Sequence, residues 1–211
     1  MGGRTIFVTR DLGPDDPWRA ALEAAGLAVR ARSLLRFEAE APGPLPDCDW
    51  IFAYSRNAVR FAAAAAELPA RVLIGAMGPG TAEAWRQTSR QPDFVGDGDP
   101  AGVAQAFRQA TPRGARVAFA QAADSRRSVE RALGDHLVAL PWIVYRSTPD
   151  LAAVVEPADV FLLTSPLNAG AALRAHTPAT APELWVLGPT TATWCAERGY
   201  RSAIWTPPAG R

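Results

Sequence analysis

Short apolar runs alternate with helix-like segments along almost the whole chain. We predict strands at residues 5–9, 27–35, 49–54, 71–76, 115–121, 137–148, 159–165 and 184–188. Helical patterns follow most of them and begin at Asp16 with Pro17, at Ser55, within residues 78–81, at Asp99 with Pro100, at Ser125, at Pro166 and at Thr190. Segment 38–47, rich in proline and acidic residues, indicates a linker or surface loop. Strands that alternate with helices are typical of α/β proteins whose parallel sheets are covered on both faces.

The chain also repeats itself. DWIFAYSRNAV begins at Asp49 and DVFLLTSPLNA at Asp159, while GPGTA begins at Gly78 and GPTTA at Gly188. Both pairs are 110 residues apart, and the same offset separates LAVRARSLL at 27–35 from LVALPWIVY at 137–145. This period is far too long for a solenoid. We therefore predict two similar α/β domains.

Each repeat contains two helix starts, and each start has a counterpart of the same type in the other repeat. One follows a strand that ends in Ser55 or Ser165, and the other follows Gly-Pro with Thr81, or with Thr190 and Thr191. Helix N-termini favour anions, and in doubly wound sheets they gather at the carboxyl ends of the strands. Each serine or threonine could equally be a helix cap and nothing more. Four related sites in two repeats favour a cleft for a molecule that carries several carboxylates or phosphates.

Composition narrows the classes of partner. A formal net charge of +1 gives no overall field that would attract nucleic acid or a membrane. The N-terminus starts directly into a strand pattern, and no apolar run approaches the ~18–20 residues that span a bilayer. Cys48 and Cys195 lie in unrelated contexts, so we interpret them as buried, reduced thiols. We expect a cytoplasmic monomer without a nucleic-acid or membrane partner.

Several familiar chemistries lack their motifs. His136 and His176 are isolated from other metal ligands, which argues against a zinc site. The glycines of FVGDGDPAG do not match a dinucleotide fingerprint, and a helix capped by Asp99 with Pro100 at its first position accounts for the segment. Neither a nucleophile elbow nor a P-loop occurs. A sugar-transferring enzyme would need a nucleotide site, and the sequence offers none.

Taken together, the motifs resemble the uroporphyrinogen-III synthase family. The resemblance covers nearly the whole chain through FVTR, DWIFAYSRNAV, AMGPGTAEA, RVAFAQAADSRRSVERAL, VYRST, DVFLLTSPLNA and VLGPTTAT, in this order. It implies an α/β protein with two flavodoxin-like domains, each a doubly wound parallel sheet, joined by two extended linkers. Domain 1 would take residues 1–35 and 149–211, domain 2 residues 41–142, and the linkers residues 36–40 and 143–148.

The resemblance also implies a reaction. Members of the family convert linear hydroxymethylbilane into uroporphyrinogen III, a step of haem biosynthesis. Ring D is inverted through a spirocyclic pyrrolenine and water is lost, so the enzymes are lyases that use neither a metal nor an organic cofactor. Their substrate is a linear tetrapyrrole with many carboxylates, and it therefore matches the polyanion cleft expected above.

Family positions can be carried over residue by residue. Tyr145, in VYRST, matches the tyrosine that would act as general acid on the departing hydroxide. It could equally be a linker tyrosine that packs its ring and exposes its hydroxyl to water. The resemblance implies substrate contacts at Arg10, Ser55, Asn57, Gly80, Thr81, Arg126, Arg127, Ser165, Leu167, Gly188, Thr190 and Thr191.

Two departures from the family pattern stand out. Tyr54 precedes Ser55 where relatives usually have threonine. Relatives usually carry a helix after the last strand, whereas this sequence stops at IWTPPAGR, soon after Ile204. We therefore expect one face of the first domain's sheet to be thinly covered. A hypothesis of another class also stays open, namely a non-catalytic two-domain protein that binds an anion or a tetrapyrrole.

Overall fold

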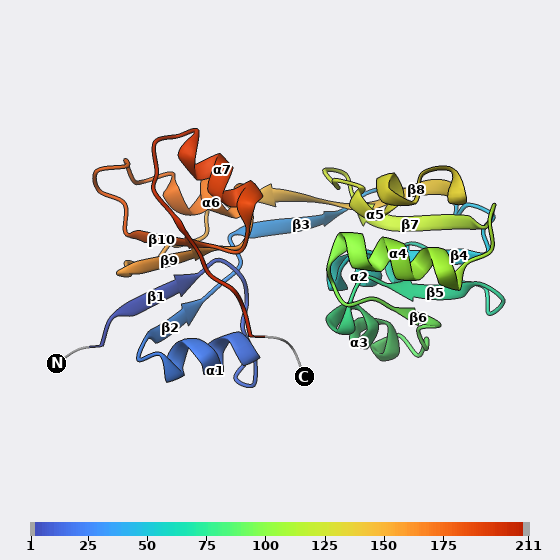
Figure 1. Ribbon diagram of the computed structural model, residues 1–211, viewed down its shortest axis with the longest axis horizontal. Helices are drawn as coiled ribbons and strands as arrows, with labels where there is room; N and C mark the ends of the chain where they lie inside the picture. The colour runs from blue at the N-terminus through green and yellow to red at the C-terminus, as the bar shows by residue number, and fades with distance from the viewer. Residues whose placement is uncertain (1–2, 209–211) are drawn as a thin grey trace. The chain divides into compact units, whose positions relative to one another are not determined.

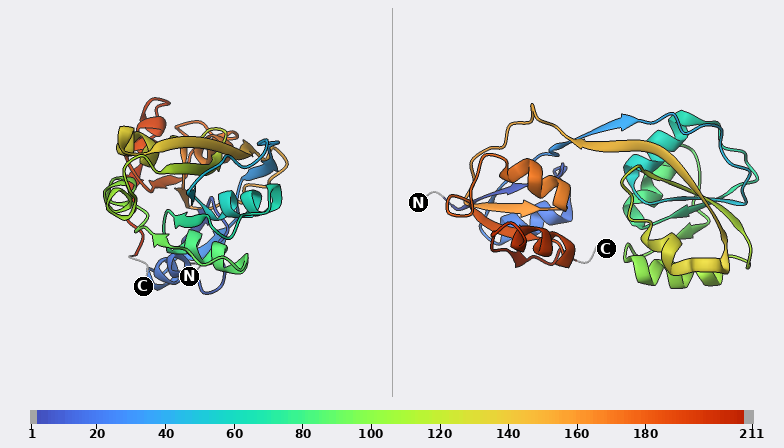
Figure 2. Two further views of the ribbon diagram at one scale, coloured as in Figure 1. Left: turned by 90° about the vertical axis from the view of Figure 1, so that its right-hand side faces the viewer. Right: turned by 90° about the horizontal axis from the view of Figure 1, so that it is seen from above.

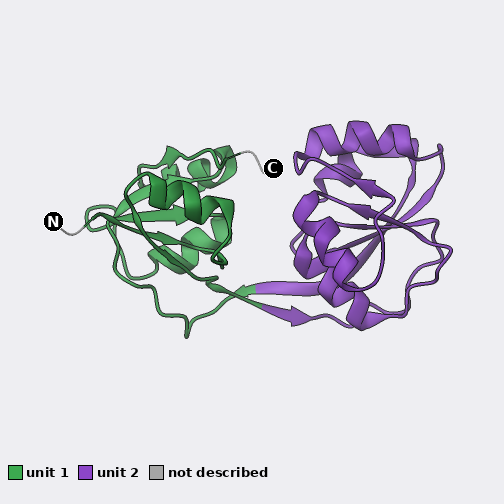
Figure 3. Cartoon of the chain, turned by 90° about the horizontal axis from the view of Figure 1, so that it is seen from below, with its two compact units in different colours: residues 1–36, 148–211 green, residues 37–147 purple. Residues whose placement is uncertain are grey.

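The computed structural model describes residues 3–208 and divides into two compact units. Unit 1 consists of residues 1–36 and 148–211, and unit 2 of residues 37–147 (Figure 3). Each unit is built around its own parallel sheet, with helices on both faces (Figures 1 and 2). The sequence therefore predicted the α/β class correctly.

The sheet of unit 1 has five parallel strands. In chain order they are β1 (Thr5–Val8), β2 (Ala28–Ala31), β9 (Val160–Leu163), β10 (Glu183–Val186) and β11 (Ala203–Ile204). Across the sheet the order is β11-β10-β9-β1-β2. Renumbered within the unit, this is the 2-1-3-4-5 order of flavodoxin-like folds, and the strand order reverses between β1 and β9.

Alternating side chains of unit 1 pack on opposite faces of this sheet. Phe7 and Phe161 lie with α6 (Pro166–Leu173) and α7 (Pro189–Ala196), whereas Ile6 and Val8 pack with Leu22 of α1 (Pro17–Ala24). On the α1 face Trp205, which follows β11, packs edge-on against Trp18 at 5.3 Å between ring centroids. Where relatives were expected to place a final helix, this aromatic pair covers part of the sheet.

Unit 2 has a six-stranded sheet of order β3-β8-β7-β4-β5-β6. Its strands are β3 (Leu35–Ala39), β4 (Trp50–Ala53), β5 (Leu73–Ala76), β6 (Phe94–Val95), β7 (Arg116–Ala122) and β8 (Val138–Pro149). The five strands from β4 to β8 are parallel and follow the order 3-2-1-4-5. The expectation of flavodoxin order is wrong for this unit, because β5 and β6 extend in one direction before β7 crosses to the other side of β4.

Helices cover both faces of the unit 2 sheet as well. On one face α2 (Arg56–Ala65) and α3 (Pro79–Gln87) pack over Ile51, Ile74 and Ala118. On the other face α4 (Pro100–Ala110) and α5 (Ser128–Leu133) pack over Phe52 and Phe119. A short 3₁₀ turn, η1 (Gly134–His136), follows α5. Asp99 caps α4, as predicted, by accepting a hydrogen bond from the Gly102 N–H at 2.9 Å.

Most predicted elements match the structure to within about two residues, but two differ in a way that matters. Residues 27–35 do not form one strand, because Ser33 forms a turn in which its N–H donates to Asp11 at 2.9 Å and its hydroxyl accepts from the Leu35 N–H at 3.3 Å. The helix expected from Ser125 begins instead at Ser128. The Ser125 hydroxyl accepts from the Arg127 N–H at 3.2 Å, which closes a turn, and Arg127 has a left-handed backbone with φ 51°.

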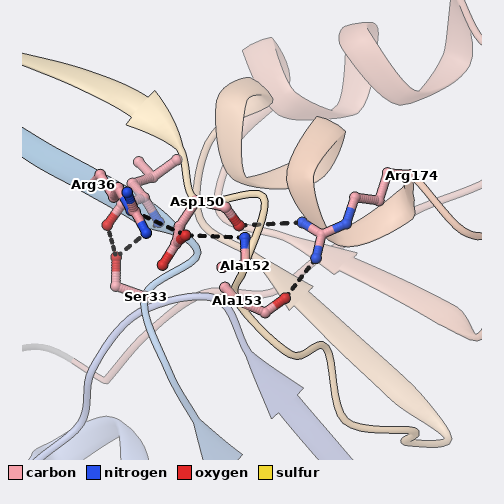
Figure 4. A network of polar contacts seen from close by, with 7 residues as sticks. Ser33, Arg36, Asp150, Ala152, Ala153 and Arg174 are labelled. Carbon is pink, nitrogen blue, oxygen red and sulfur yellow. Dashed lines mark hydrogen bonds and ion pairs between the residues drawn. The ribbon is translucent and has the colours of Figure 1, made fainter.

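The chain passes between the units in β3 and β8, and these strands include residues 36–39 and 143–148 of the segments predicted as linkers. The two strands run in opposite directions (Figure 1). At their ends in unit 1, Arg36 pairs with Asp150 at 3.1 Å, and the Asp150 N–H donates to the Leu34 carbonyl at 2.8 Å. Arg174 of unit 1 donates to the carbonyls of Asp150 and Ala153 (Figure 4). This network holds the two chain crossings together within unit 1.

Candidate functional site

Ser55 stands at the carboxyl end of β4, next to the point where the strand order of unit 2 reverses. It has an extended backbone, and its hydroxyl accepts a hydrogen bond from the Ala58 N–H at 3.1 Å. The predicted role as the N-cap of α2 is confirmed. In open α/β sheets ligands bind at this kind of position, so Ser55 marks the place to look for a site in unit 2.

Tyr145 lies beside this cap. Its hydroxyl oxygen is 3.2 Å from the Ser55 hydroxyl oxygen, and its ring stacks on Phe61 of α2 with centroids 5.2 Å apart. Phe37 packs edge-on from β3. The linker alternative with a water-exposed hydroxyl does not describe this residue, because Tyr145 is only 8% exposed and its hydroxyl has a protein partner.

A β-bulge gives Tyr145 its orientation. Along β7 and β8, Gln121 is opposite Ile143, but the next residue, Ala122, is opposite Tyr145, so Val144 is the extra residue. Strand residues alternate between faces, and a bulge re-aims the side chains that follow it. Val144 and Tyr145 consequently both join the core beneath α2.

Burial raises the pKa of Tyr145, and the hydrogen bond with Ser55 opposes this rise. The charge of Arg60, on the second turn of α2, also opposes it. Because the raised value lies above the ordinary tyrosine pKa, the hydroxyl stays protonated at neutral pH. It is available as a proton donor next to a second hydroxyl.

A buried polar cluster at the same strand ends was not predicted from the sequence. It consists of Tyr54 after β4, Gln121 in β7 and Glu130 in α5, and Gln121 is fully buried. The Tyr54 hydroxyl accepts from the Glu130 N–H at 3.3 Å. Burial raises the pKa of Tyr54 to about 12 and raises the pKa of Glu130, the latter opposed by Gln121 and the charge of Arg127. A glutamine at the end of an otherwise apolar strand was the one signal that could have revealed it.

Arg126 and Arg127 were expected to open a helix and bind carboxylates. They precede α5 instead, with Arg127 at the N-cap position and Arg126 exposed. Burial raises the pKa values of Tyr54 and Glu130, and the positive charge of Arg127 opposes both rises, so this charge acts on the buried cluster.

The helix start at residues 78–81 is built differently. Gly78 is the N-cap of α3 and makes no side-chain hydrogen bond. Thr81 is 6% exposed within the first turn, and its N–H donates to the Gly78 carbonyl at 3.0 Å. The interpretation of Thr81 as a cap is therefore wrong, because the glycine takes that position. Gly80 and Asn57 line a pocket between α3 and α2.

Unit 1 repeats the arrangement at the ends of β1 and β9. Ser165 caps α6, as predicted, by accepting from the Asn168 N–H at 3.2 Å. The Thr9 and Thr164 hydroxyl oxygens are 3.2 Å apart, and the Asn168 amide donates to both Thr164 and Ser165. Leu167 lines an apolar pocket of about 360 Å³ with Pro166 and Trp194. This network of hydroxyl groups lies where the strand order of unit 1 reverses.

The second helix start of unit 1 matches that of unit 2. Gly188 is the N-cap of α7 and makes no side-chain hydrogen bond, and Thr191 is 5% exposed in the first turn. The interpretation of Thr190 and Thr191 as caps fails for the same reason as that of Thr81. Thr190, in contrast, is exposed at the start of the helix.

Arg10 follows β1 and is engaged within unit 1. It pairs with Asp16, the N-cap of α1, at 2.9 Å, and its guanidinium lies 4.1 Å from the centre of the Trp18 ring. Asp16 caps the helix through the Trp18 N–H at 2.9 Å, as predicted. A substrate carboxylate at Arg10 would therefore share the guanidinium with Asp16.

In residues 3–208 there is no group of three or more histidine, cysteine or acidic side chains that could hold a metal ion. His136 contacts the Thr111 carbonyl at 3.1 Å, and His176 packs edge-on against Phe161. Within the same residues, no helix is long and apolar enough to cross a membrane. Cys48 and Cys195 are buried free thiols, as predicted.

Comparison with known families decides the family of this chain. A sequence model described as uroporphyrinogen-III synthase HemD matches residues 16–208. The chain belongs to the uroporphyrinogen-III synthase family. This confirms the resemblance noted in the motifs and places the chain among enzymes of porphyrin and haem biosynthesis with a small-molecule tetrapyrrole substrate. Among individual curated proteins, none matches it.

Solved structures of family members share the fold. The uroporphyrinogen-III synthetase of Helicobacter pylori 26695 is 16% identical, with a TM-score of 0.68 over 97% of this chain and 94% of that chain. A mutant uroporphyrinogen III synthase of the extremely thermophilic bacterium Thermus thermophilus is 18% identical, with a TM-score of 0.55 over 99% and 94% of the two chains. Identities this low show a common α/β fold. The roles of individual residues in this member of the uroporphyrinogen-III synthase family must be argued from its own geometry.

Proposed function

We propose that this chain is a uroporphyrinogen-III synthase, a lyase that closes hydroxymethylbilane to uroporphyrinogen III with inversion of ring D. The family match over residues 16–208 carries the proposal. The polar groups at the strand ends of each unit support it, because a polycarboxylate needs several anion-binding positions. We further propose that the enzyme is a cofactor-free monomer in the cytoplasm, where its two free thiols would stay reduced.

Tyr145 is the residue that we propose as general acid. Departure of the terminal hydroxyl needs a proton. The Tyr145 hydroxyl is protonated at neutral pH, as in any tyrosine, and burial raises its pKa further. The O–H bond of the tyrosine would break as water leaves, and the Ser55 hydroxyl, 3.2 Å away, would stabilise the phenolate oxygen by donating a hydrogen bond. The proton lost when ring D bonds to the macrocycle would restore the tyrosine.

Substrate carboxylates would bind mainly at backbone N–H groups. The first turns of α2, α3, α6 and α7 present such groups at the carboxyl ends of the strands, and the helix dipole favours a negative charge there. The residues proposed for these contacts are Ser55, Asn57, Gly80, Thr81, Ser165, Leu167, Gly188, Thr190 and Thr191. Arg10, Arg126 and Arg127 would add charge-assisted hydrogen bonds.

The test is the identity of the product isomer. The linear tetrapyrrole becomes an electrophile when its hydroxyl departs and closes unaided to the type I isomer, so the enzyme must hold a single conformation. Purified protein, dialysed against a chelator and given freshly made hydroxymethylbilane, should yield uroporphyrinogen III. Type I product alone would reject the synthase and favour a non-catalytic binding protein, whereas activity restored by added metal would reject the cofactor-free mechanism.

A further inference from the structure

A pocket of about 480 Å³ lies between α2 and α3 of unit 2. It is lined by Arg56, Asn57 and Arg60 of α2 and by Gly80, Glu83 and Gln87 of α3, among others. Its volume falls within the range of small-molecule sites. Asn57 and Gly80 already belong to the proposed substrate contacts, whereas the two arginines have no role in the mechanism so far.

The two arginines carry charge that the protein does not neutralise. Within residues 3–208, neither Arg56 nor Arg60 has an ion pair or a hydrogen bond, and Arg60 only stacks over the Phe61 ring at 4.5 Å. Glu83, the acidic residue of the pocket lining, is engaged with Arg86 at 3.2 Å. Among the described residues, the pocket thus presents two positive charges without an ion-pair partner, while the carboxylate of Glu83 already pairs with Arg86.

This arrangement is unfavourable for the helix itself. Arg56 and Arg60 are four residues apart on α2, where like charges repel each other. Both lie in the N-terminal half of the helix, and Arg56 stands at its first position, where the helix dipole disfavours a cation. A local cost without an internal compensation is typical of a site that a ligand completes.

Gly80 lets the Arg56 guanidinium lie against the first turn of α3. A Cβ atom at position 80 would be 2.9 Å from Nη2 and 3.0 Å from Nε of Arg56. In the first turn of α3, Pro79 has no N–H and the Thr81 N–H donates to the Gly78 carbonyl, which leaves the Gly80 N–H without a partner within the helix. The Arg56 guanidinium and the Gly80 N–H therefore lie at the same side of the pocket, and both are donors that can bind carboxylate oxygens.

The pocket also connects to the proposed general acid. Phe61, which follows Arg60, stacks on Tyr145 with an angle of 12° between the rings, and the charge of Arg60 opposes the rise that burial causes in the pKa of that tyrosine. Ser55, next to Arg56 in sequence, lies 3.2 Å from the Tyr145 hydroxyl. A ligand held by the two arginines would consequently lie beside the residues that the reaction needs.

We propose that Arg56 and Arg60, with the first turn of α3, form a binding subsite for an acidic side chain of the tetrapyrrole. The inference rests on the proposed function for the identity of the ligand. The Arg56 guanidinium can hold a carboxylate through two parallel hydrogen bonds. Arg60 adds a second positive charge, which could hold the second carboxylate of the same pyrrole ring.

The test compares Arg56→Gln and Arg60→Gln with the control Arg71→Gln, which removes an exposed arginine of unit 2 that pairs with Asp47. Loss of a charge-assisted hydrogen bond should raise the KM for hydroxymethylbilane roughly tenfold or more in each site variant. The melting temperature should stay equal or rise, because a repulsive charge is removed. The control should keep the wild-type KM.

Gly80→Ala tests the same subsite without removing charge. The new methyl group would displace the flexible end of Arg56 rather than the backbone, so the fold should persist while KM rises. A KM within twofold of wild type in both arginine variants would overturn the proposal, whatever the effect of Gly80→Ala.

A binding titration separates this inference from the proposed function. Should the wild type yield only the type I isomer, the synthase proposal fails, and titration with uroporphyrinogen III alone then decides the subsite. Weaker binding by Arg56→Gln and Arg60→Gln than by wild type and Arg71→Gln would support it. Equal affinity in all four proteins, or no binding by the wild type, would overturn it.

Discussion

Tyr145 owes its position to one extra residue in a strand. Without the bulge at Val144, its side chain would share the face of Ile143 instead of lying under α2. The aromatic contacts with Phe61 and Phe37 then fix the ring, so the hydroxyl meets Ser55 with little freedom. A general acid is effective only when it is held in this way.

Replacement of Tyr145 by phenylalanine should separate catalysis from packing. We expect kcat for type III formation to fall about a hundredfold, at the low end of what a general acid contributes. The free energy of unfolding should fall by only about 1 kcal/mol, because one hydrogen bond is lost and the ring contacts remain. Isomer analysis at several times and a denaturant titration would measure the two effects.

Tyr200→Phe is the matched control. Its hydroxyl also donates one hydrogen bond, to the His176 carbonyl at 2.8 Å, but it lies away from the strand ends that carry the site. The control should lose similar stability and retain kcat. An unchanged rate in Tyr145→Phe would show that this tyrosine is not the acid.

Glu130→Gln should reveal the cost of burying a carboxyl group. Burial raises the pKa of Glu130 in the folded state, so the folded protein binds its proton more tightly than the unfolded chain does. This cost is absent below the ordinary glutamate pKa, grows as pH rises from there to the raised pKa of the folded state, and is fully present above that value. The variant should therefore be more stable than wild type at pH 7 and equally stable near the ordinary pKa, about 4.3.

Melting curves of both proteins across this pH range would check the prediction. Glu23→Gln on α1 serves as control, since that carboxylate is half exposed and pairs with Arg19 on the surface. A stability difference between Glu130→Gln and wild type that does not change with pH would contradict the assignment.

At the scale of elements, the capping of a helix can be separated from a role in the site, because one capping residue contacts Tyr145 and another does not. Ser55 and Asp99 each accept a hydrogen bond from a first-turn N–H, but only Ser55 also touches Tyr145. Ser55→Ala and Asp99→Ala should each cost about 1 kcal/mol of stability. Only Ser55→Ala should lower the rate of type III formation, and equal rates in the two variants would leave Ser55 a cap and nothing more.

The helix starts show what the sequence could and could not predict. Asp16, Ser55, Asp99 and Ser165 were recognised as caps because a side-chain oxygen before a helical pattern has a local cause. The threonines after Gly-Pro were misread, since glycine at the cap leaves no side-chain signal. Ser125 failed as a cap because its hydroxyl closes a turn instead.

Residues that depend on distant contacts were harder to predict. From the sequence alone, Glu130 is expected to be exposed to solvent, because it lies in a helix with several charged residues. It is buried only because α5 packs against β4 and β7. The bulge that turns Tyr145 is likewise a property of two paired strands, and one strand alone does not show it. The sequence therefore revealed candidate residues that lie in recognisable motifs, but it did not reveal the cluster of Tyr54, Gln121 and Glu130, which depends on contacts between distant segments.

At the scale of the whole molecule, the repeat predicts similar elements but not their order in space. The motifs at Asp49 and Asp159 both form a buried central strand with a capped helix after it. The two sheets nevertheless differ in strand order, 2-1-3-4-5 in unit 1 and 3-2-1-4-5 in unit 2. Strand order depends on which edge each crossover reaches, and the local pattern of apolar residues does not encode that choice.

The division into units has a consequence for folding that can be measured. Residues 37–147 are continuous and contain two core clusters of their own, so a fragment with these bounds should fold alone. Unit 1 is interrupted, yet its two pieces meet closely, because the Asp150 N–H donates to the Leu34 carbonyl at 2.8 Å and Arg36 pairs with Asp150. A chain that joins residue 36 to residue 148 through a short glycine-rich turn should therefore also fold.

Thermal unfolding followed by circular dichroism would show one cooperative transition for the fragment and one for the joined chain if this argument holds. Asp150→Ala in the joined chain tests its basis, since it removes the carboxylate that binds Arg36 and the Ala152 N–H. That change should lower the melting temperature of the joined chain. Because Arg36 and Asp150 form a partly exposed ion pair, this decrease in melting temperature should be small. If the joined chain unfolds without cooperativity even with Asp150 present, unit 1 needs unit 2 to fold.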